Sequence, residues 1–344
     1  FKQKTAYEIR LSLVGSEMCI RDRFLMLWLV LRVHLESGAA KLLSGDPTWR
    51  DLTAMASYYE TAPLPTWLAW YFHQLPLWVH QAASGYTLVV ELLVPLLLWA
   101  GYRVRLVVFL VLATLQVGVI LTANYTFFNY LTIVLCLFVL DDRHLPGRGA
   151  DLAMPRSVAA GGLRRLAAAV VAIILMALSF VPFSRFVAPL PELDPVRRVL
   201  ATFRCINAYH LFASMTLVRR EAVIEGSDDG SEWREYEFHH KPGDPLRRPE
   251  FVAPHQPRVD FRMWFLLLGS HWGAPYFDTL LDRILHDPKA VAPLFAVDPF
   301  PVVPPRYLRV AVYRYWFTGW EEGRRTGAWW RRESQGYSRQ RERF

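Results

Sequence analysis

The chain has 344 residues, of which 53% are hydrophobic and 20% are charged, and its formal charge is +8 at neutral pH. Its mean hydropathy of only +0.16 excludes a chain embedded in a membrane throughout, so a polar portion must dilute a very apolar one. No zinc-finger or helix-turn-helix pattern accompanies the basic charge, which argues against a nucleic-acid partner and favours arginines that set membrane topology.

Residues 1–23 resemble a translated sequencing-adapter remnant. The stretch has no initial Met, no signal-peptide layout and no sustained hydrophobic period, so we exclude it from the fold prediction and expect the native N-terminus to be missing. Three cysteines, Cys19, Cys136 and Cys205, match no metal motif and no Cys-x-x-Cys pair, and we expect neither a metal site nor a cofactor.

Apolar stretches predict a multi-span membrane domain over residues 24–183. The expected spans lie at about 24–40, 86–101, 104–122, 127–140 and 166–183. A bilayer core of about 30 Å takes some 17–20 helical residues, so the run 127–140 is short by itself.

The placement of arginine predicts the orientation of these spans. Arg103 and Arg105 occupy one short link, and the link 141–165 holds five more arginines. Because basic links stay on the cytoplasmic side, residues 41–85 and everything after residue 183 are expected on the far side. That side is the lumen of the endoplasmic reticulum in a eukaryote, or the periplasm beside the inner membrane in a bacterium.

Residues 184–344 contain no further span and predict a soluble, mainly β domain, β-sandwich-like with some helix. Alternation of side chains indicates half-buried antiparallel strands. The expected elements are strands at 219–225, 233–238 and 307–317, a hairpin turn at 226–231, helices at 260–268 and 275–286, and a partly disordered basic tail at 319–344.

Several polar residues fall within or at the ends of apolar stretches. The expected structural polar positions are Glu36, Glu91, Asn124 and Asn129. Glu91 is the most informative of them, because an ionisable group inside a span costs roughly 2.5 kcal/mol or more unless it is paired or neutral. His34, Lys41 and Asn129 are its candidate partners.

Six segments together resemble the lipase maturation factor family. They are Glu36–Trp49 (ESGAAKLLSGDPTW), Tyr59–Pro65 (YETAPLP), Asn124–Asn129 (NYTFFN), Asn207–Phe212 (NAYHLF), Ile224–Gly230 (IEGSDDG) and Phe251–Arg258 (FVAPHQPR). The resemblance implies a multi-span membrane protein with a lumenal C-terminal domain that helps secretory proteins to fold and mature, lipases in eukaryotic relatives. The partners would be client secretory proteins and the lipid bilayer. Exposed aromatic, proline and polar residues of the later segments are the client-binding candidates, namely Asn207, Tyr209, His210, Phe212, His255 and Arg258.

A second, local resemblance leaves an enzyme open as the alternative. The helix end Gly38–Leu42, followed by a turn and Trp49, is similar to the vitamin K-dependent γ-carboxylase group, in which the lysine matching Lys41 is implicated as a base. On this hypothesis Lys41 and Glu91 are catalytic; on the other, Lys41 extends to the membrane interface and there is no catalytic residue. No Gly-x-Ser-x-Gly elbow is present, so the chain is not itself a lipase of that mechanism.

Overall fold

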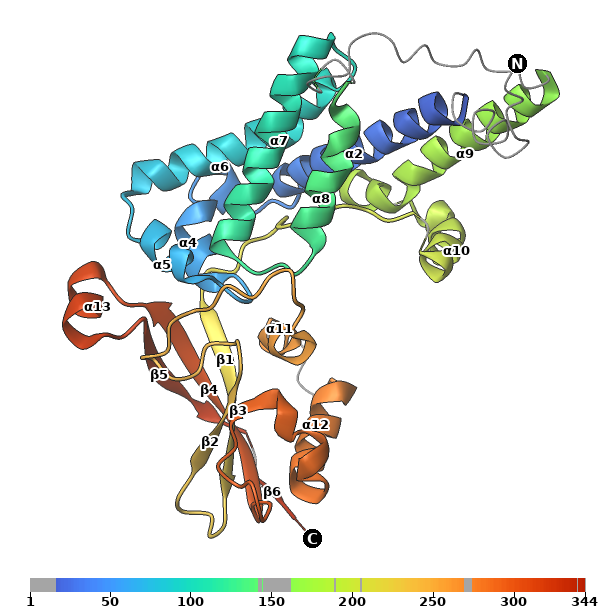
Figure 1. The fold of residues 1–344 in the computed structure, drawn as a ribbon. Coiled ribbons are helices and arrows are strands. Elements are labelled where there is room, and N and C mark those ends of the chain that lie inside the picture. Colours follow the sequence, from blue (N-terminus) through green and yellow to red (C-terminus); the bar gives the residue numbers. More distant parts are fainter. Residues whose placement is uncertain are drawn as a thin grey trace, which may run out of the picture. The chain divides into compact units, whose positions relative to one another are not determined.

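The computed structural model describes residues 17–141, 144, 162–188, 190–204, 206–268, 274–338 and 340–343, drawn in Figure 1. Their contacts divide the chain into two compact units, each made of three segments. The helical unit consists of Phe1–Leu52, Ala82–Gln116 and Tyr130–Ser214, and the sheet unit of Thr53–Gln81, Val117–Asn129 and Met215–Phe344. We expected one boundary near residue 184, whereas the sheet unit also includes two segments from the first half of the chain.

The first half of the chain is helical. In chain order its elements are α2 (Glu17–Leu43), α3 (Pro47–Arg50), α4 (Ala54–Thr61), α5 (Trp67–His73), α6 (Leu77–Leu92), the 3-10 turn η1 (Val94–Leu97), α7 (Tyr102–Thr122), α8 (Phe128–Cys136), η2 (Leu137–Val139), α9 (Gly162–Val187), η4 (Pro191–Leu193) and α10 (Asp194–Phe203). The helix α2 begins inside the stretch 1–23.

Two of the described helices, α7 and α9, are long and apolar enough to cross a membrane. Only 17% of the apolar window of α7 and 11% of that of α9 are buried in the protein. A core helix of a soluble protein would be mostly covered, so these exposed apolar surfaces suit a lipid environment. The expected spans 104–122 and 166–183 fall inside α7 and α9.

Two other expected spans differ from a single continuous helix. In the stretch 86–101, α6 ends at Leu92 and the 3-10 turn Val94–Leu97 follows, because Pro95 lacks an N–H and disfavours helix in the residue before it. The stretch 127–140 forms α8 and η2, an apolar element of Phe128–Val139, which spans only about 18 Å at 1.5 Å per residue.

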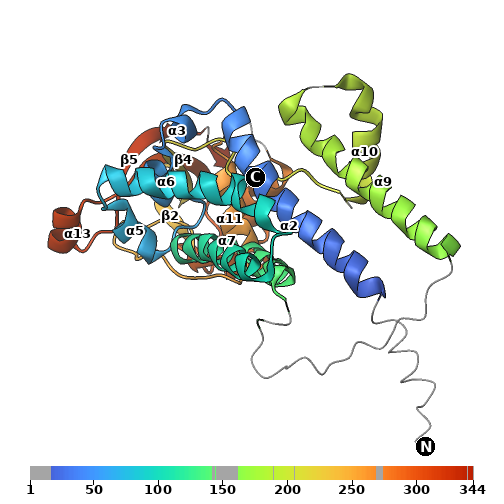
Figure 2. The same cartoon turned by 90° about the horizontal axis from the view of Figure 1, so that it is seen from above.

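The helix α2 packs against several elements of the helical unit. Its Trp28 indole donates a hydrogen bond of 3.2 Å to Ser179 of α9 and its ring lies 5.4 Å from that of Phe180, and Figure 2 shows α2 and α9 side by side. Leu27 and Val30 of α2 also join the buried apolar cluster of this unit. This packing buries most of the side chains on one side of α2.

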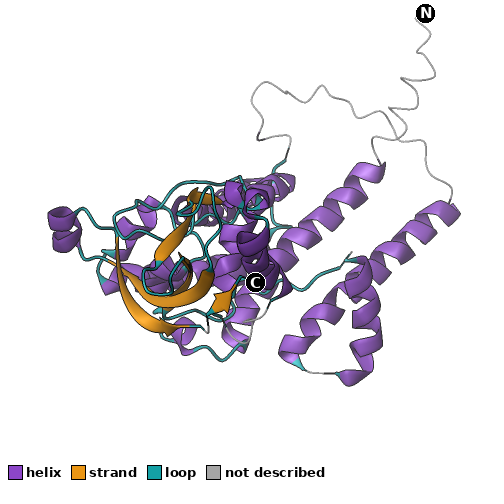
Figure 3. Ribbon diagram, turned by 90° about the horizontal axis from the view of Figure 1, so that it is seen from below, coloured by secondary structure: helices purple, strands orange, loops and turns teal. Residues whose placement is uncertain are grey.

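The sheet unit is built around one antiparallel sheet (Figure 3). Its strands run in the order β3-β2-β1-β4-β5, and β6 also pairs with β4. The strands and the later helices are β1 (Arg219–Ser227), β2 (Arg234–Phe238), α11 (Arg258–Phe265), α12 (Pro275–His286), η5 (Pro288–Ala290), η6 (Ala292–Leu294), β3 (Phe295–Val297), β4 (Tyr307–Phe317), α13 (Trp320–Thr326), β5 (Trp330–Tyr337) and β6 (Arg341–Glu342).

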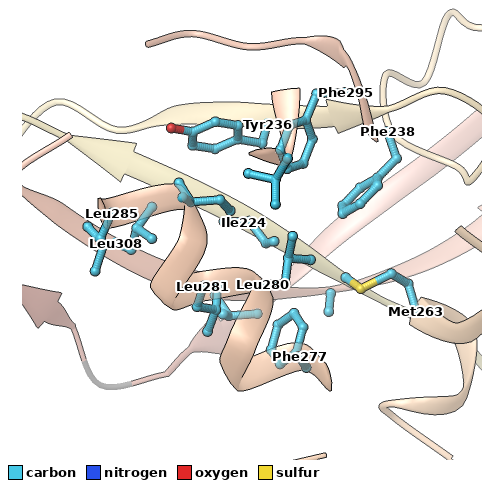
Figure 4. Close-up of a cluster of buried hydrophobic side chains, with 14 of the residues drawn as sticks. Ile224, Tyr236, Phe238, Met263, Phe277, Leu280, Leu281, Leu285, Phe295 and Leu308 are labelled. Atoms are coloured by element: carbon cyan, nitrogen blue, oxygen red, sulfur yellow. The ribbon is translucent and has the colours of Figure 1, made fainter. Parts of the chain in front are cut away.

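The core of this unit lies between the sheet and two helices, and not between two sheets. Tyr236 and Phe238 of β2 alternate with more exposed neighbours, as the sequence pattern predicts, and they point into a cluster that contains Leu280 and Leu281 of α12 and Met263 of α11 (Figure 4). The fold of the sheet unit is therefore α+β, which corrects the β-sandwich-like expectation. The amphipathic helices α11 and α12 supply the apolar cover that a second sheet would give.

Residues 319–338 and 340–343 do not form the partly disordered tail that we expected. They form α13 and the edge strands β5 and β6. Trp330 is buried and stacks on Phe317 at 4.2 Å between ring centroids, and the Arg332 guanidinium contacts both carboxylate oxygens of Glu235 at 2.8 Å. The charged residues of an edge strand face water, which is why the pattern resembles that of a solvated tail.

The early segments of the sheet unit attach directly to the sheet. Arg219 of β1 donates to the backbone carbonyls of Glu60, Ala62 and Pro63 and pairs with Glu221 at 2.6 Å. A backbone bridge joins Pro65 to Ala123, at the end of α7. The buried guanidinium thus satisfies carbonyl groups that a loop would otherwise leave unpaired.

Candidate functional site

Charged side chains form a stripe along the buried side of α2. Arg32, Glu36 and Lys41 stand four and five residues apart, so they project from neighbouring turns, and they are exposed by only 5%, 4% and 1%. Buried charges are expensive unless each finds partners. We call these three residues and Glu91 the charged stripe.

Lys41 pairs with Glu91 of α6. Its Nζ lies 2.6 Å from the Glu91 Oε2 and also donates to the carbonyls of Leu211 at 2.9 Å and Ser37 at 3.5 Å. The Trp49 ring lies 5.1 Å from the same nitrogen. An ammonium group has three N–H bonds, and three acceptors surround this one.

Arg32 and Glu36 form the second pair of the stripe. The Arg32 Nε donates to Glu36 at 2.6 Å, and its Nη2 donates to the carbonyl of Asn207 at 2.6 Å. The other carboxylate oxygen of Glu36 accepts the backbone N–H of Tyr209 at 2.9 Å. The guanidinium also lies 5.4 Å from the Tyr209 ring. Burial raises the pKa of the Tyr209 hydroxyl, so that side chain is neutral.

Both pairs hold one segment without helix or strand, residues 206–213, which we call the strap. Besides the contacts above, Trp49 donates its indole N–H to the carbonyl of Phe212 at 2.9 Å, and Ser44 donates to that of Ala213 at 2.6 Å. The strap lies along α2 and contacts the charged stripe through backbone carbonyl and N–H groups. Its carbonyls and N–H groups complete the hydrogen bonding of the buried charges.

Four of the client-binding candidates belong to the strap, whose contacts lie in the helical unit. Asn207, Tyr209 and Phe212 bond to α2 or to Trp49 through their backbone. His210 is exposed, with its ring 5.1 Å from that of Phe186. The structure thus places one exposed candidate side chain on the strap at His210, and a second, Asn207, at its start.

The remaining sequence-predicted residues belong to the sheet unit. Asn124, 1% exposed, donates to the carbonyls of Leu64 and Glu250, and its Oδ1 accepts the N–H groups of Val252 and Ala253. The Asn124 side chain therefore joins three separate segments of the unit. Asn129 is also buried. His255 and Arg258 are exposed, with the His255 ring 6.3 Å from that of His240.

The segments that resemble one family contact one another within each unit. In the helical unit, Glu36–Trp49 bonds to Asn207–Phe212. In the sheet unit, Asn124 joins Tyr59–Pro65 to Phe251–Arg258. Sequence reasoning missed Arg32 and Arg219 as partners of these segments. The spacing of Arg32 four residues before Glu36 was the available signal, since such pairs face each other on a helix.

The charged groups of the stripe are buried and engaged in ion pairs and hydrogen bonds. A general base needs a free lone pair within reach of a substrate, whereas Lys41 is 1% exposed and its nitrogen is surrounded by acceptors. Among the residues that the structure describes, no three His, Cys, Asp or Glu side chains are grouped so as to hold a metal ion.

The two membrane-length helices with exposed apolar surfaces suit the class of membrane proteins, and the antiparallel sheet unit is a separate folded part of the chain. Comparison with known families agrees with this class. Residues 17–147 match the model of the lipase maturation factor transmembrane domain, and residues 205–339 match that of the lipase maturation factor C-terminal domain. The chain belongs to the lipase maturation factor family.

Individual relatives support the same assignment. The chain is 32% identical over 415 aligned positions to lipase maturation factor 2 of Gallus gallus and of Homo sapiens, with 90% of this chain and 58% of each relative covered. It is 33% identical over 342 positions to lipase maturation factor 1 of Bos taurus, covering 90% and 59%. The chain thus spans somewhat more than half the length of these relatives. No solved structure matches it.

Proposed function

We propose that this chain is a membrane-anchored, non-enzymatic maturation factor that binds secretory proteins while they fold, with lipases as clients if the source is eukaryotic. Membership of a family whose members are named lipase maturation factors supports this role. On this proposal the sheet unit lies in the lumen of the endoplasmic reticulum, or in the periplasm if the source is bacterial. The arginines at 103 and 105 support that orientation; most of the second basic link, 142–143 and 145–161, lies outside the described residues.

The observation that favours a non-enzymatic role is that the Lys41 ammonium group already has an acceptor for each of its three N–H bonds. Its nitrogen contacts Glu91, Leu211 and Ser37, and these contacts fix the strap on α2. The strap ends only a few residues before β1 starts at Arg219. The charged stripe therefore holds in place the segment that precedes β1 in the sequence. This is a framework role, suited to an anchored binding domain.

The proposal is tested by crosslinking the full chain to its neighbours in native membranes and identifying them by mass spectrometry. We expect newly made, incompletely folded secretory proteins. Recovery of only mature proteins, at the level of an unrelated membrane protein, would contradict the proposal. Among the candidate contact residues, His255→Ala and Arg258→Ala should lower the crosslinking yield. Lys289→Ala, also exposed on the sheet unit, is the matched control and should leave the yield unchanged.

The enzyme alternative, a γ-carboxylase-like reaction with Lys41 as base, makes a different prediction for one substitution. Lys41→Arg keeps a positive charge and donors for Glu91 but cannot act as a base at physiological pH. If Lys41 is structural, the Lys41→Arg variant should retain partial or full maturation of the client, measured as the amount of active client that is secreted. Complete loss of maturation in Lys41→Arg, together with normal folding of the variant, would favour the enzyme.

A further inference from the structure

An aromatic hollow lies in the sheet unit, between α5 and α13. It has a volume of about 470 Å³. Four aromatic side chains line it together with Arg324 and the small residues of α13 and the turn after it: Trp70, Tyr71, Trp320, Trp329, Gly323, Gly327 and Ala328. None of these residues takes part in the charged stripe. The hollow is therefore a separate feature, to which the proposed maturation role assigns no task.

The rings of the hollow are arranged as a corner. Trp70 and Trp320 lie nearly parallel, 5.5 Å apart, while Trp329 stands at 68° to Trp70 at the same distance. Tyr71 meets Trp320 at 66°. Trp320 and Tyr71 remain 47% and 42% exposed, so ring surface stays open to a ligand.

The base of the hollow is fixed. Trp70 is buried and donates its indole N–H to the hydroxyl of Thr318 at 3.1 Å, so it offers the hollow a ring and no donor. A Cβ on Gly323 would come within 2.9 Å of the Trp70 ring. Glycine at this position lets the Trp70 indole lie directly against α13. The aromatic rings are therefore already arranged for binding in the absence of a ligand.

The hollow adjoins the end of a membrane-length helix. The backbone N–H of Thr66 donates to the carbonyl of Thr122, the last residue of α7, at 3.0 Å. Helix α5 starts at the next residue, Trp67, and Trp70 and Tyr71 follow within one turn. Because α7 is long and apolar enough to cross a bilayer, α5 begins where that helix leaves it. Tryptophan and tyrosine at that height are typical of the headgroup region.

The chemistry of the hollow suits a zwitterionic headgroup. Aromatic faces attract quaternary ammonium groups, which they bind after desolvation. The exposed guanidinium of Arg324, 5.9 Å from the Trp320 ring, can pair with a phosphate next to that ammonium. We propose that the aromatic hollow binds the phosphocholine headgroup of a bilayer phospholipid, with the trimethylammonium on the rings and the phosphate on Arg324. The inference rests on the membrane anchoring in the proposed function, but not on client binding.

An anionic lipid and an extended peptide fit the hollow less well. An anionic glycerol headgroup has no cation for the rings. Recognition of a proline-rich peptide pairs aromatic grooves with donors to the peptide carbonyls, and the buried indole of Trp70 already gives its N–H to Thr318. A ligand that combines one soft cation with one phosphate uses both the rings and the guanidinium.

The test is lipid binding to the full chain in detergent, followed by native mass spectrometry with added phosphatidylcholine. We expect about one tightly held lipid per chain. Tyr71→Ala and Trp320→Ala should weaken binding by about tenfold or more, given about 2 kcal/mol for a desolvated cation–π contact. Arg324→Gln should weaken it severalfold. Trp78→Ala removes a tryptophan that is 68% exposed but does not line the hollow, and it should bind as the unchanged chain does.

Each other outcome contradicts the proposal. Equal binding of phosphatidylglycerol would show a general interfacial patch, and unchanged binding in Trp320→Ala would place the lipid elsewhere. If soluble phosphocholine binds as tightly as the lipid, the ligand is not the bilayer. A proline-rich peptide that binds in place of the lipid and is lost in Trp320→Ala would make this a peptide site. Thermal unfolding of each variant checks its fold, and client crosslinking, measured separately, distinguishes failure of this proposal from failure of the maturation role.

Discussion

The amino group of Lys41 lies 2.6 Å from the carboxylate of Glu91, and both residues are buried in the helical unit. Removing one partner leaves a buried charge without compensation, which costs about 3–5 kcal/mol. We therefore expect Glu91→Leu alone to destabilise the chain strongly. The double variant Lys41→Met/Glu91→Leu should recover much of that loss, because no charge remains to be satisfied. Thermal unfolding in detergent measures both effects, and a double variant as unstable as the single one would show that the pair does more than neutralise charge.

The hold of Glu36 on the strap is open to a local test. Its carboxylate accepts the N–H of Tyr209 at 2.9 Å and the Arg32 guanidinium at 2.6 Å. We expect Glu36→Ala to speed hydrogen–deuterium exchange across residues 206–213 by tenfold or more, corresponding to about 1.4 kcal/mol or more of lost protection. Glu36→Gln retains an acceptor oxygen and should show a smaller change. Equal exchange in the two variants would mean that the charge, and not the hydrogen bond, holds the strap.

The sequence predicted part of this site. The cost of an ionisable group in an apolar helix required a partner for Glu91, and Lys41 was one of the three candidates. The strap was not predictable, because it meets α2 through backbone carbonyls of residues such as Leu211 and Asn207. Every residue has such a group, so no side-chain pattern marks the contact. The aromatic hollow could not be predicted from the sequence either, because Trp70 and Trp329, which both line it, are far apart along the chain.

The fold shows the same limits. Alternation predicted β2, where buried side chains alternate with more exposed ones. It failed for β5, an edge strand in which Trp330 is buried and the residues from Arg331 to Tyr337 are exposed or half-buried. Apolar length found α7 and α9, but it could not show that the stretch 86–101 is interrupted at Pro95.

Asn124 should be intolerant of even an isosteric change. Its amide makes hydrogen bonds to Leu64, Glu250, Val252 and Ala253. Asn124→Asp loses both N–H donors and sets a carboxylate against two carbonyl oxygens, so we expect a loss of about 2–4 kcal/mol in the free energy of unfolding. Because the amide nitrogen is buried and bonded, the sequon Asn124–Thr126 should stay unglycosylated in a eukaryotic host. A glycosidase-sensitive mass shift that disappears in Thr126→Ala would contradict this.

His73 gives the sheet unit a pH dependence. Burial, and to a lesser degree His80, lower the pKa of His73 to about 4 from 6.5, and a backbone interaction with Ala56 opposes them. The unfolded chain binds this proton near pH 6.5 and the folded chain only near pH 4, so stability falls as pH drops from 6.5 towards 4. The full effect is about 3 kcal/mol in the free energy of unfolding. Burial raises the pKa of the neighbouring Glu60 above its ordinary value. Protonation of Glu60 therefore adds stability as the pH falls towards 4.5, which opposes the effect of His73 in that part of the range.

The variant His73→Gln removes the titrating ring and should flatten the fall in unfolding temperature between pH 6.5 and pH 5. His286→Gln, at an exposed histidine of α12, is the control and should retain it. An unchanged pH profile in His73→Gln would assign the dependence to another group.

Close approach of α2 and α6 depends on Gly38. A Cβ there would lie 2.9 Å from the Cβ of Glu91 and from the Cγ of Leu92, a distance at which something must shift. Gly38→Ala would force the helices apart beside the Lys41–Glu91 pair, and we expect a loss of about 1–3 kcal/mol. In Gly85→Ala, within α6 itself, the added methyl would meet only Leu52 at 4.0 Å, and its better helix propensity should make it neutral or slightly stabilising. Thermal unfolding of the two variants compares them directly; equal stability would mean that α2 and α6 can separate at this point without loss.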